Sequence, residues 1–276
     1  MKLFNKIAIV GVGLIGGSLG LAIKKKGLAH QVIGVSRQRK TLRAALRNRA
    51  IDIASQDIGI VKDADLIILA APVDTIIALA LKIAKIARED CLVTDVGSTK
   101  GEIVSKLEKV FPHYLGSHPL AGSEKKGVVN ACAKMFNNSL CILTPTRATR
   151  SAVLNKIKRF WQAVGARTVN LAPDKHDRIL SFISHLPHIA AFSLIGAVPR
   201  QHLKLASGGL KDTTRIAYSD AGLWADIFLS NRRNILKAIA AFQQELAGIK
   251  SAVARKDKKS LLGILKKAKT KRELLG

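Results

Sequence analysis

The sequence predicts an α/β protein in which a mostly parallel sheet is followed by an all-helical part. Up to about residue 171, short and continuously apolar runs alternate with helical patterns, as expected for strands that are buried on both faces of a sheet. After residue 171 almost no strand pattern remains. The 276 residues suffice for two ordinary domains, which we place at residues 1–171 and 172–276.

The elements of the first part follow from its apolar runs and from the residues that end them. Gly27 closes the first helix and Pro72 ends the third strand, because glycine favours helix C-termini and proline interrupts strand pairing. Strands are expected at residues 6–10, 31–35, 66–70, 92–95, 114–116 and 140–143, and helices at residues 15–26, 41–49, 75–87 and 99–110.

The second part reads as helices at residues 174–182, 187–197, 224–252 and 258–271. In the longest of these, apolar residues recur every three or four positions, and they form a stripe of Ile235, Ile239, Phe242, Leu246, Ile249 and Val253. Such a narrow stripe packs against another helix. The spacing leaves open whether that helix belongs to the same chain or to a partner subunit.

The composition is strongly basic. The chain has 46 Lys and Arg against 19 Asp and Glu, which gives a formal net charge of +27 and invites a nucleic-acid-binding interpretation. However, aromatic residues make up only 4%, too few for a base-stacking platform, and the charge is spread along the chain. We interpret the excess as solvated surface that attracts anionic small molecules, with nucleic acid not expected as a partner.

The cysteines and the apolar runs bear on the cellular location of the protein and on whether it binds a metal. Cys91, Cys132 and Cys141 form no CxxC pair and no even disulfide set, which favours a reducing cytoplasmic location. No metal site is expected. The apolar run at residues 7–23 contains five glycines and ends in three lysines, unlike a signal peptide. No other apolar stretch approaches the roughly 20 residues that cross a bilayer, so no membrane partner is expected.

A glycine motif, GVGLIG at residues 11–16, follows the first expected strand and opens a helix. Gly11 permits the tight turn, Gly13 lets the backbone approach a pyrophosphate, and Gly16 lets the helix pack closely on the strand. The helix start, with Leu14 and Ile15, presents free N–H groups to the phosphates. This context predicts a Rossmann-type dinucleotide-binding domain.

The end of the second strand bears on the choice of dinucleotide. Many NAD-binding domains carry an acidic residue there that binds the ribose 2′-hydroxyl, whereas this chain has Ser36 and Arg37 and no acid. A hydroxyl and a guanidinium suit a 2′-phosphate, which a carboxylate would repel. We therefore favour NADP over NAD as the cofactor.

Two further residues lie where open α/β sheets bind ligands. Thr99 and Glu102 form a capping-box pattern, which would leave Ser98 just outside a helix at the carboxyl end of the fourth strand. His118 lies beside Pro119, between glycines, in an expected loop after the next strand. Because histidine titrates near neutral pH, His118 is a candidate general base.

Four motifs, in this order along the chain, resemble those of the prephenate/arogenate dehydrogenase family of tyrosine biosynthesis. They are DVGSTKG at residues 95–101, GSHPLAGSE at 116–124, SHLPH at 184–188 and KDTTR at 211–215. The resemblance extends from Lys6 to about Ala252. It implies a nucleotide-binding domain followed by a helical domain that binds substrate and dimerises, and so favours a homodimer formed through the apolar stripe.

The resemblance also implies a reaction and roles for single residues. Prephenate would be oxidised to 4-hydroxyphenylpyruvate, with loss of carbon dioxide and hydride transfer to NAD(P)⁺. His118 matches the family's proton acceptor, Ser98 the serine that orients it and contacts the substrate hydroxyl, and Arg215 the arginine that binds a substrate carboxylate. Further substrate-binding candidates are His188, Ser123 and Glu124.

Alternative activities remain open. Family members that prefer arogenate tend to lack the acid at the Glu124 position and the second histidine of SHLPH, and this chain has both. Its Ser36 and Arg37 nevertheless resemble those of NADP-dependent arogenate dehydrogenases, which make tyrosine directly. We favour prephenate. A β-hydroxyacid dehydrogenase would share the nucleotide-binding domain but has no counterpart to His118, and a nucleic-acid-binding protein would show no turnover.

Overall fold

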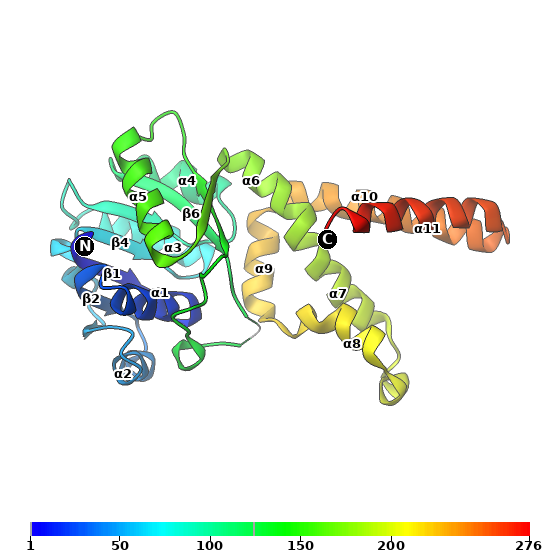
Figure 1. Ribbon diagram of the computed structural model, residues 1–276, viewed down its shortest axis with the longest axis horizontal. Coiled ribbons are helices and arrows are strands. Elements are labelled where there is room, and N and C mark those ends of the chain that lie inside the picture. The colour runs from blue at the N-terminus through cyan, green and yellow to red at the C-terminus, as the bar shows by residue number, and fades with distance from the viewer. Residues whose placement is uncertain (1, 124) are drawn as a thin grey trace.

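The computed structural model describes residues 2–123 and 125–276. A sheet part ends with β8 at Asn170, and a helical part begins with α6 at Pro173. The two parts lie side by side, and helices α10 and α11 project away from the sheet (Figure 1). Glu124, one of the substrate-binding candidates, lies outside the described residues.

The sheet has eight strands in the order β3-β2-β1-β4-β5-β6-β7-β8. Strands β1 to β6 are parallel to one another, and β7 pairs with β6 in the antiparallel sense. The expected α/β class with a mostly parallel sheet is confirmed, while β3 and β8 were not anticipated. The bounds are β1 Phe4–Val10, β2 Ala29–Val35, β3 Ile53–Ser55, β4 Leu66–Leu69, β5 Leu92–Asp95, β6 Tyr114–Leu120, β7 Leu140–Thr144 and β8 Arg167–Asn170.

Helices cover both faces of this sheet and make up the whole of the second part. In the sheet part they are α1 Leu14–Lys25, α2 Arg39–Arg47, η1 Ile58–Asp63, α3 Val73–Ile83, α4 Gly101–Leu107, η2 Val128–Asn130 and α5 Ser151–Val164. In the helical part they are α6 Pro173–Leu180, η3 Ser181–His185, α7 Leu186–Ala197, η4 Arg200–Leu205, α8 Gly208–Thr214, η5 Arg215–Tyr218, α9 Ala221–Ser230, α10 Arg232–Ala254 and α11 Lys258–Glu273.

The strands are continuously apolar because both faces of the sheet are buried. Along β1, Ile7 and Ile9 enter one core cluster, with side chains from α1 and α5. Ala8 and Val10 enter the other, with side chains from α3 and α4. Burying one such large side chain contributes about 1.5–3 kcal/mol. The sheet is thus a rigid platform whose carboxyl edge carries the site residues.

The long helix expected at residues 224–252 is two helices, α9 and α10, which meet at Asn231. The Asn231 side chain is buried and donates to the carbonyl oxygen of Asp177 at 2.8 Å, with His185 Nδ1 at 3.2 Å. These contacts come from distant parts of the chain. The expectation of one continuous helix was wrong because local spacing does not reveal them.

The helical run Pro173–Ala197, made of α6, η3 and α7, is long and apolar enough to cross a membrane by length and composition alone. It departs from the expectation that no second stretch approaches that length. Core helices of soluble proteins pass the same test. This run carries His176, Asp177 and His185, three polar residues that are buried within the protein.

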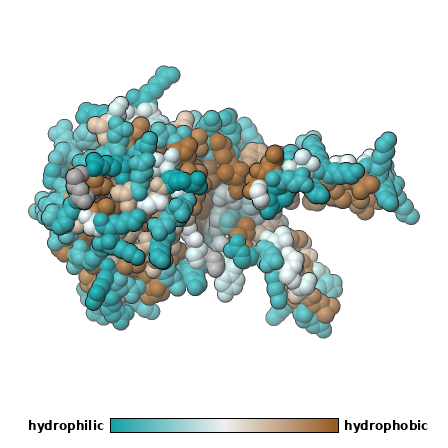
Figure 2. All heavy atoms as spheres, in the orientation of Figure 1, coloured by the Kyte–Doolittle hydropathy of each residue, from teal (hydrophilic) through white to brown (hydrophobic). Residues whose placement is uncertain are grey.

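Many large apolar side chains of the helical part are exposed in a single chain. Along the stripe of α10, Phe242 is 40% exposed, Leu246 55% and Val253 58%. Brown, apolar atoms are visible along the projecting α10–α11 arm (Figure 2). The stripe is therefore covered within the chain at Ile235, whereas Phe242, Leu246 and Val253 leave much of their surface exposed.

Candidate active site

His118 lies inside strand β6, where it pairs with Ile142 of β7. The expectation of a loop was wrong, and the reason lies in the neighbouring strand. β5 ends at Asp95, opposite Gly116, so one edge of β6 is free beyond that point. Pro119, which has no N–H, is tolerated next to a free edge. A rigid strand thus holds His118, of which only 8% is exposed.

A chain of hydrogen bonds joins His118 to the helical part. His118 Nδ1 lies 2.8 Å from His176 Nε2, and His176 Nδ1 lies 2.8 Å from Asp177 Oδ1. Both partners come from α6 and are buried. Sequence reasoning missed His176 and Asp177, whose only local signal was a histidine beside an aspartate just after Pro173. Since Nδ1 is engaged, Nε2 is the ring nitrogen left to meet a substrate.

Asp177 also holds the start of α4. Its two carboxylate oxygens accept from the backbone N–H of Lys100 at 2.7 Å and of Gly101 at 2.8 Å. The expected capping box of Thr99 and Glu102 is therefore wrong: the helix begins at Gly101, and Thr99 Oγ1 lies 3.0 Å from the hydroxyl oxygen of Ser230. The actual cap comes from another domain, where no local pattern shows it.

Ser98 is half-buried in the turn between β5 and α4. It lies at the carboxyl end of the sheet, as expected. Among the residues that the structure describes, no hydrogen bond joins Ser98 to His118; His176 is the residue that orients the ring. Contact of Ser98 with the imidazole or with a substrate hydroxyl stays a prediction.

Burial and charge keep the site histidines neutral. Burial, the neighbouring His176 and the Lys100 ammonium lower the pKa of His118 well below its ordinary value. Burial also lowers the pKa of His176, although its bond to Asp177 opposes this. Burial alone would raise the pKa of Asp177, but hydrogen bonds from His176 and two backbone N–H groups outweigh it and lower that pKa. A neutral imidazole next to a charged carboxylate relay can accept a proton.

The glycine motif has the geometry of a pyrophosphate cradle. Gly11 has a φ of +103°, and a Cβ there would lie 2.3 Å from the carbonyl oxygen of Ala70. A Cβ on Gly16 would lie 2.1 Å from the carbonyl oxygen of Gly11, whereas one on Gly13 would meet nothing within 4 Å. Helix α1 begins at Leu14 with no side-chain cap and no acid in its first turn. Its N–H groups are therefore available to an anion, and these residues fit a dinucleotide.

The turn after β2 is basic and is held from β3. Ser36 donates its N–H to the carbonyl oxygen of Ser55 at 3.2 Å, and Arg37 is exposed. Gln56 donates to the Arg37 carbonyl oxygen at 2.7 Å and accepts from Arg39 Nε at 2.7 Å. The turn thus offers two guanidinium groups and a hydroxyl where a ribose 2′-substituent would be recognised.

The other substrate-binding candidates are spread over the helical part and one loop. His188 in α7 stacks on Trp224 of α9, with ring centroids 3.4 Å apart, and its Nδ1 lies 3.0 Å from the carbonyl oxygen of Ser184. Arg215 opens η5 and is exposed. Ser123 accepts from the N–H of Lys125 at 3.0 Å. Within residues 2–123 and 125–276, none of these three candidates hydrogen-bonds His118.

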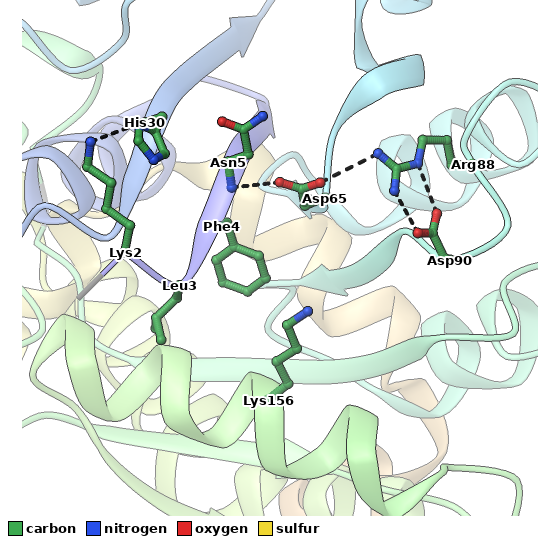
Figure 3. A pocket seen from close by; sticks show the side chains of 9 residues that line it. All are labelled: Lys2, Leu3, Phe4, Asn5, His30, Asp65, Arg88, Asp90 and Lys156. Carbon is green, nitrogen blue, oxygen red and sulfur yellow. Dashed lines mark hydrogen bonds and ion pairs between the residues drawn. The ribbon is translucent and has the colours of Figure 1, made fainter.

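A separate cavity of about 390 Å³ lies at the opposite edge of the sheet (Figure 3). It is bordered by the amino ends of β1 and β2 and by the residues just before β4 and β5. Its carboxylates are already engaged: Arg88 bonds both oxygens of Asp90, at 2.9 and 2.6 Å, and lies 3.5 Å from Asp65. Parallel sheets bind ligands at the carboxyl edge, so this cavity is not the dinucleotide site.

Comparison with known families gives a match over nearly the whole chain. Residues 19–170 match the nucleotide-binding domain of prephenate dehydrogenase, and residues 172–267 match the prephenate dehydrogenase dimerization domain. Prephenate dehydrogenase of Bacillus subtilis is 36% identical over 98% of this chain and 76% of its own length. Cyclohexadienyl dehydrogenase of Zymomonas mobilis is 32% identical over 99% of this chain and 96% of its own length.

Solved structures agree with this match. Prephenate dehydrogenase of A. aeolicus, in complex with hydroxyphenyl propionate and NAD⁺, has a TM-score of 0.93 and 36% identity, over 99% of this chain and 98% of that one. Arogenate dehydrogenase of Synechocystis has a TM-score of 0.84 and 29% identity, over 98% of this chain and 100% of that one. A 3-hydroxyisobutyrate dehydrogenase of Mycobacterium tuberculosis, at 15% identity and a TM-score of 0.53, shares the fold alone. The chain belongs to the prephenate dehydrogenase family.

Proposed function

We propose that this protein oxidises prephenate to 4-hydroxyphenylpyruvate, with hydride transfer to NAD(P)⁺ and loss of carbon dioxide, on the way to tyrosine. The observation that carries the proposal is the buried, neutral His118, whose Nδ1 is held by His176 at 2.8 Å. The name and the substrate-analogue complex of the relatives support it.

His118 is the proton acceptor in this proposal. As hydride leaves C4 of the substrate for the dinucleotide, His118 Nε2 takes the proton of the C4 hydroxyl. The positive charge that forms on the imidazole is stabilised through His176 by the carboxylate of Asp177. Loss of the ring carboxylate as carbon dioxide then makes the ring aromatic.

The remaining site residues bind and orient the substrate. We assign a carboxylate of the substrate to Arg215, because its charge is permanent and its planar fork suits bidentate pairing. Ser98, at the carboxyl end of β5, contacts the C4 hydroxyl. Further polar contacts are assigned to His188, Ser123 and Glu124. Residues 1–171 would bind the dinucleotide, and residues 172–276 would bind substrate and form the dimer.

NADP is the preferred cofactor in this proposal. The basic turn that carries Ser36 and Arg37, held by Gln56, supports a 2′-phosphate. The double variant Ser36→Asp/Arg37→Ala should shift the ratio of kcat/KM values toward NAD, because the new carboxylate repels the 2′-phosphate and can bind a 2′-hydroxyl. A wild-type protein that already favours NAD strongly would contradict this assignment.

We also propose a homodimer in the cytoplasm. The exposed stripe of α10 and the match to a dimerization domain support the dimer. For the location, two of the cysteines lie in core clusters on opposite faces of the sheet, Cys141 on one and Cys91 on the other, so they are placed to remain thiols.

An absorbance assay at 340 nm with two substrates and two cofactors tests the function. We expect the highest kcat/KM with prephenate and NADP. The alternative is an NADP-dependent arogenate dehydrogenase, which the basic turn at Ser36 and Arg37 favours, and it would show the reverse substrate preference. Absence of turnover with both substrates would contradict the proposed function.

A further inference from the structure

One residue before His118, the carbonyl of Ser117 meets a fully buried ion pair. The side chains of Lys100 and Asp95 are each 0% exposed and bond to each other. The Asp95 carboxylate also accepts from the hydroxyl of Tyr114 at 2.7 Å and from the N–H of Gly97 at 2.8 Å. A buried ion pair adds little to stability compared with a well-packed apolar pair, because both charges lose their water. Stability alone therefore does not account for this lysine.

The ammonium of Lys100 supplies a hydrogen bond to β6 at a position that β5 does not reach. It donates to the carbonyl oxygen of Ser117 at 2.8 Å, and that carbonyl belongs to the peptide bond joining Ser117 to His118. β5 ends one position too early to reach Ser117, since its last pair is Asp95 with Gly116. The Ser117 side chain is held in addition, by Thr94 at 2.7 Å and by Trp161 at 3.0 Å.

Lys100 lies where the parts of the site meet. It follows Ser98 by two residues in the β5–α4 turn. Its backbone N–H donates to Asp177, the last residue in the chain of hydrogen bonds that starts at His118. We propose that Lys100 is a positioning residue, whose ammonium fixes the His118 peptide against the turn that carries Ser98. This inference rests on the proposed function, in which His118 is the proton acceptor.

The same ammonium contributes charge. The titratable groups near His118 are Lys100 and Asp95 of the ion pair, His176 and Asp177 from α6, His185 from η3, and Cys141 from β7. Among these, the Lys100 charge opposes a second positive charge and, with burial and His176, lowers the pKa of His118. Removing this ammonium should raise that pKa and move the acid limb of activity to higher pH.

Two variants separate positioning from simple charge compensation. Lys100→Met leaves the Asp95 carboxylate buried without its cation, so we expect a lower Tm. Asp95→Asn/Lys100→Met removes both charges. The asparagine can accept from the N–H of Gly97 through Oδ1 and donate its amide N–H to the hydroxyl oxygen of Tyr114, so we expect the Tm to recover. The kcat of the double variant should nevertheless stay about 100-fold below that of the wild type, since small misplacements in a site have that effect. The acid limb of Lys100→Met should lie at higher pH, and dinucleotide binding of both variants should be unchanged.

Lys106→Met, an exposed lysine of α4, is the matched control and should change neither kcat nor the pH profile. A double variant with wild-type Tm and kcat would show that Lys100 only neutralises Asp95, and would overturn the inference. If neither variant folds, Lys100→Arg decides, because it keeps a positive charge beside Asp95 but cannot place it at the same point. A wild-type kcat overturns the inference, and a reduced kcat with unchanged dinucleotide binding supports it. A wild type without prephenate turnover would instead mean that the proposed function fails.

Discussion

The sheet part and the helical part bury their apolar side chains in different ways. In the sheet part, strand residues alternate between two core clusters, and each cluster is covered by helices of the same chain. In the helical part, Leu229 is 72% exposed and Leu246 55% in a single chain. The apolar core of the first part is thus covered within the chain, whereas the second part carries an apolar surface suited to a second copy.

The site contains residues from both parts, and the two parts contribute residues with different roles. The sheet part supplies His118 on a strand between two others. The helical part supplies His176 and Asp177, and in our proposal Arg215. Substitutions at His118 and at its α6 partners should therefore act mainly on chemistry, and substitutions at Arg215 and on the exposed stripe mainly on substrate binding and assembly.

The largest effect is expected for His118→Asn, because it removes the proton acceptor from the rigid part. We expect kcat to fall by about 10²–10⁴-fold, while the glycine cradle continues to bind dinucleotide. Steady-state kinetics and a fluorescence titration with the dinucleotide measure the two. His202→Asn, at an exposed histidine of η4, is the control. If kcat stayed near normal, the base would lie elsewhere.

In the helical part, Arg215→Ala should act on binding. Loss of a charge-assisted pair to a substrate carboxylate costs about 2–5 kcal/mol, so KM for prephenate should rise by about 30-fold or more. Dinucleotide affinity should not change. Arg200→Ala, an exposed arginine of η4, serves as the matched variant. A large fall in dinucleotide affinity with unchanged KM for prephenate would assign Arg215 to the dinucleotide. It would contradict the division of roles between the two parts.

Assembly should respond to Leu246→Asp, which places a carboxylate in the middle of the exposed stripe of α10. In sedimentation experiments we expect the wild type at twice the 29.7 kDa of one chain, and the variant as a monomer at low concentration. Gln244→Asp, an exposed polar position of the same helix, should remain a dimer. A variant with wild-type mass would move the interface away from the stripe.

The smallest and most gradual effect is expected on stability as the pH falls. The contact between the two parts should weaken first, because the buried histidines lie there. Burial lowers the pKa of His118 and His176, and brings that of His185 to about 4. The unfolded chain therefore binds these protons first as the pH falls below roughly 6.5, and stability is lost from there downward. Each histidine adds a slope of about 1.4 kcal/mol per pH unit between its two pKa values.

Urea unfolding at several pH values between 7.5 and 5 measures this slope. His185→Asn should reduce it, whereas His202→Asn at the surface should leave it unchanged. A free energy of unfolding that is constant over this range would mean that the three histidines are not held neutral in the folded protein.

Sequence reasoning succeeded where the signal is local. The strand at Leu92–Asp95 could be predicted to the residue because it is a short apolar run, and the turn at Gly11 because its backbone needs glycine. β8 escaped because it reads RTVN and is mostly exposed at the edge of the sheet. His176 could not be found as the partner of His118, since the two are 58 residues apart and only the fold brings them together.

The carboxylate of Asp177 has a consequence for the modularity of this protein. It belongs to the second family domain, yet it caps the first helix turn after Ser98 in the first domain, with bonds of 2.7 and 2.8 Å. A sheet part cut free at residue 171 would keep its core and its glycine cradle but lose the cap of α4. The first domain alone should therefore still bind a dinucleotide, but the start of α4, next to Ser98, should be frayed.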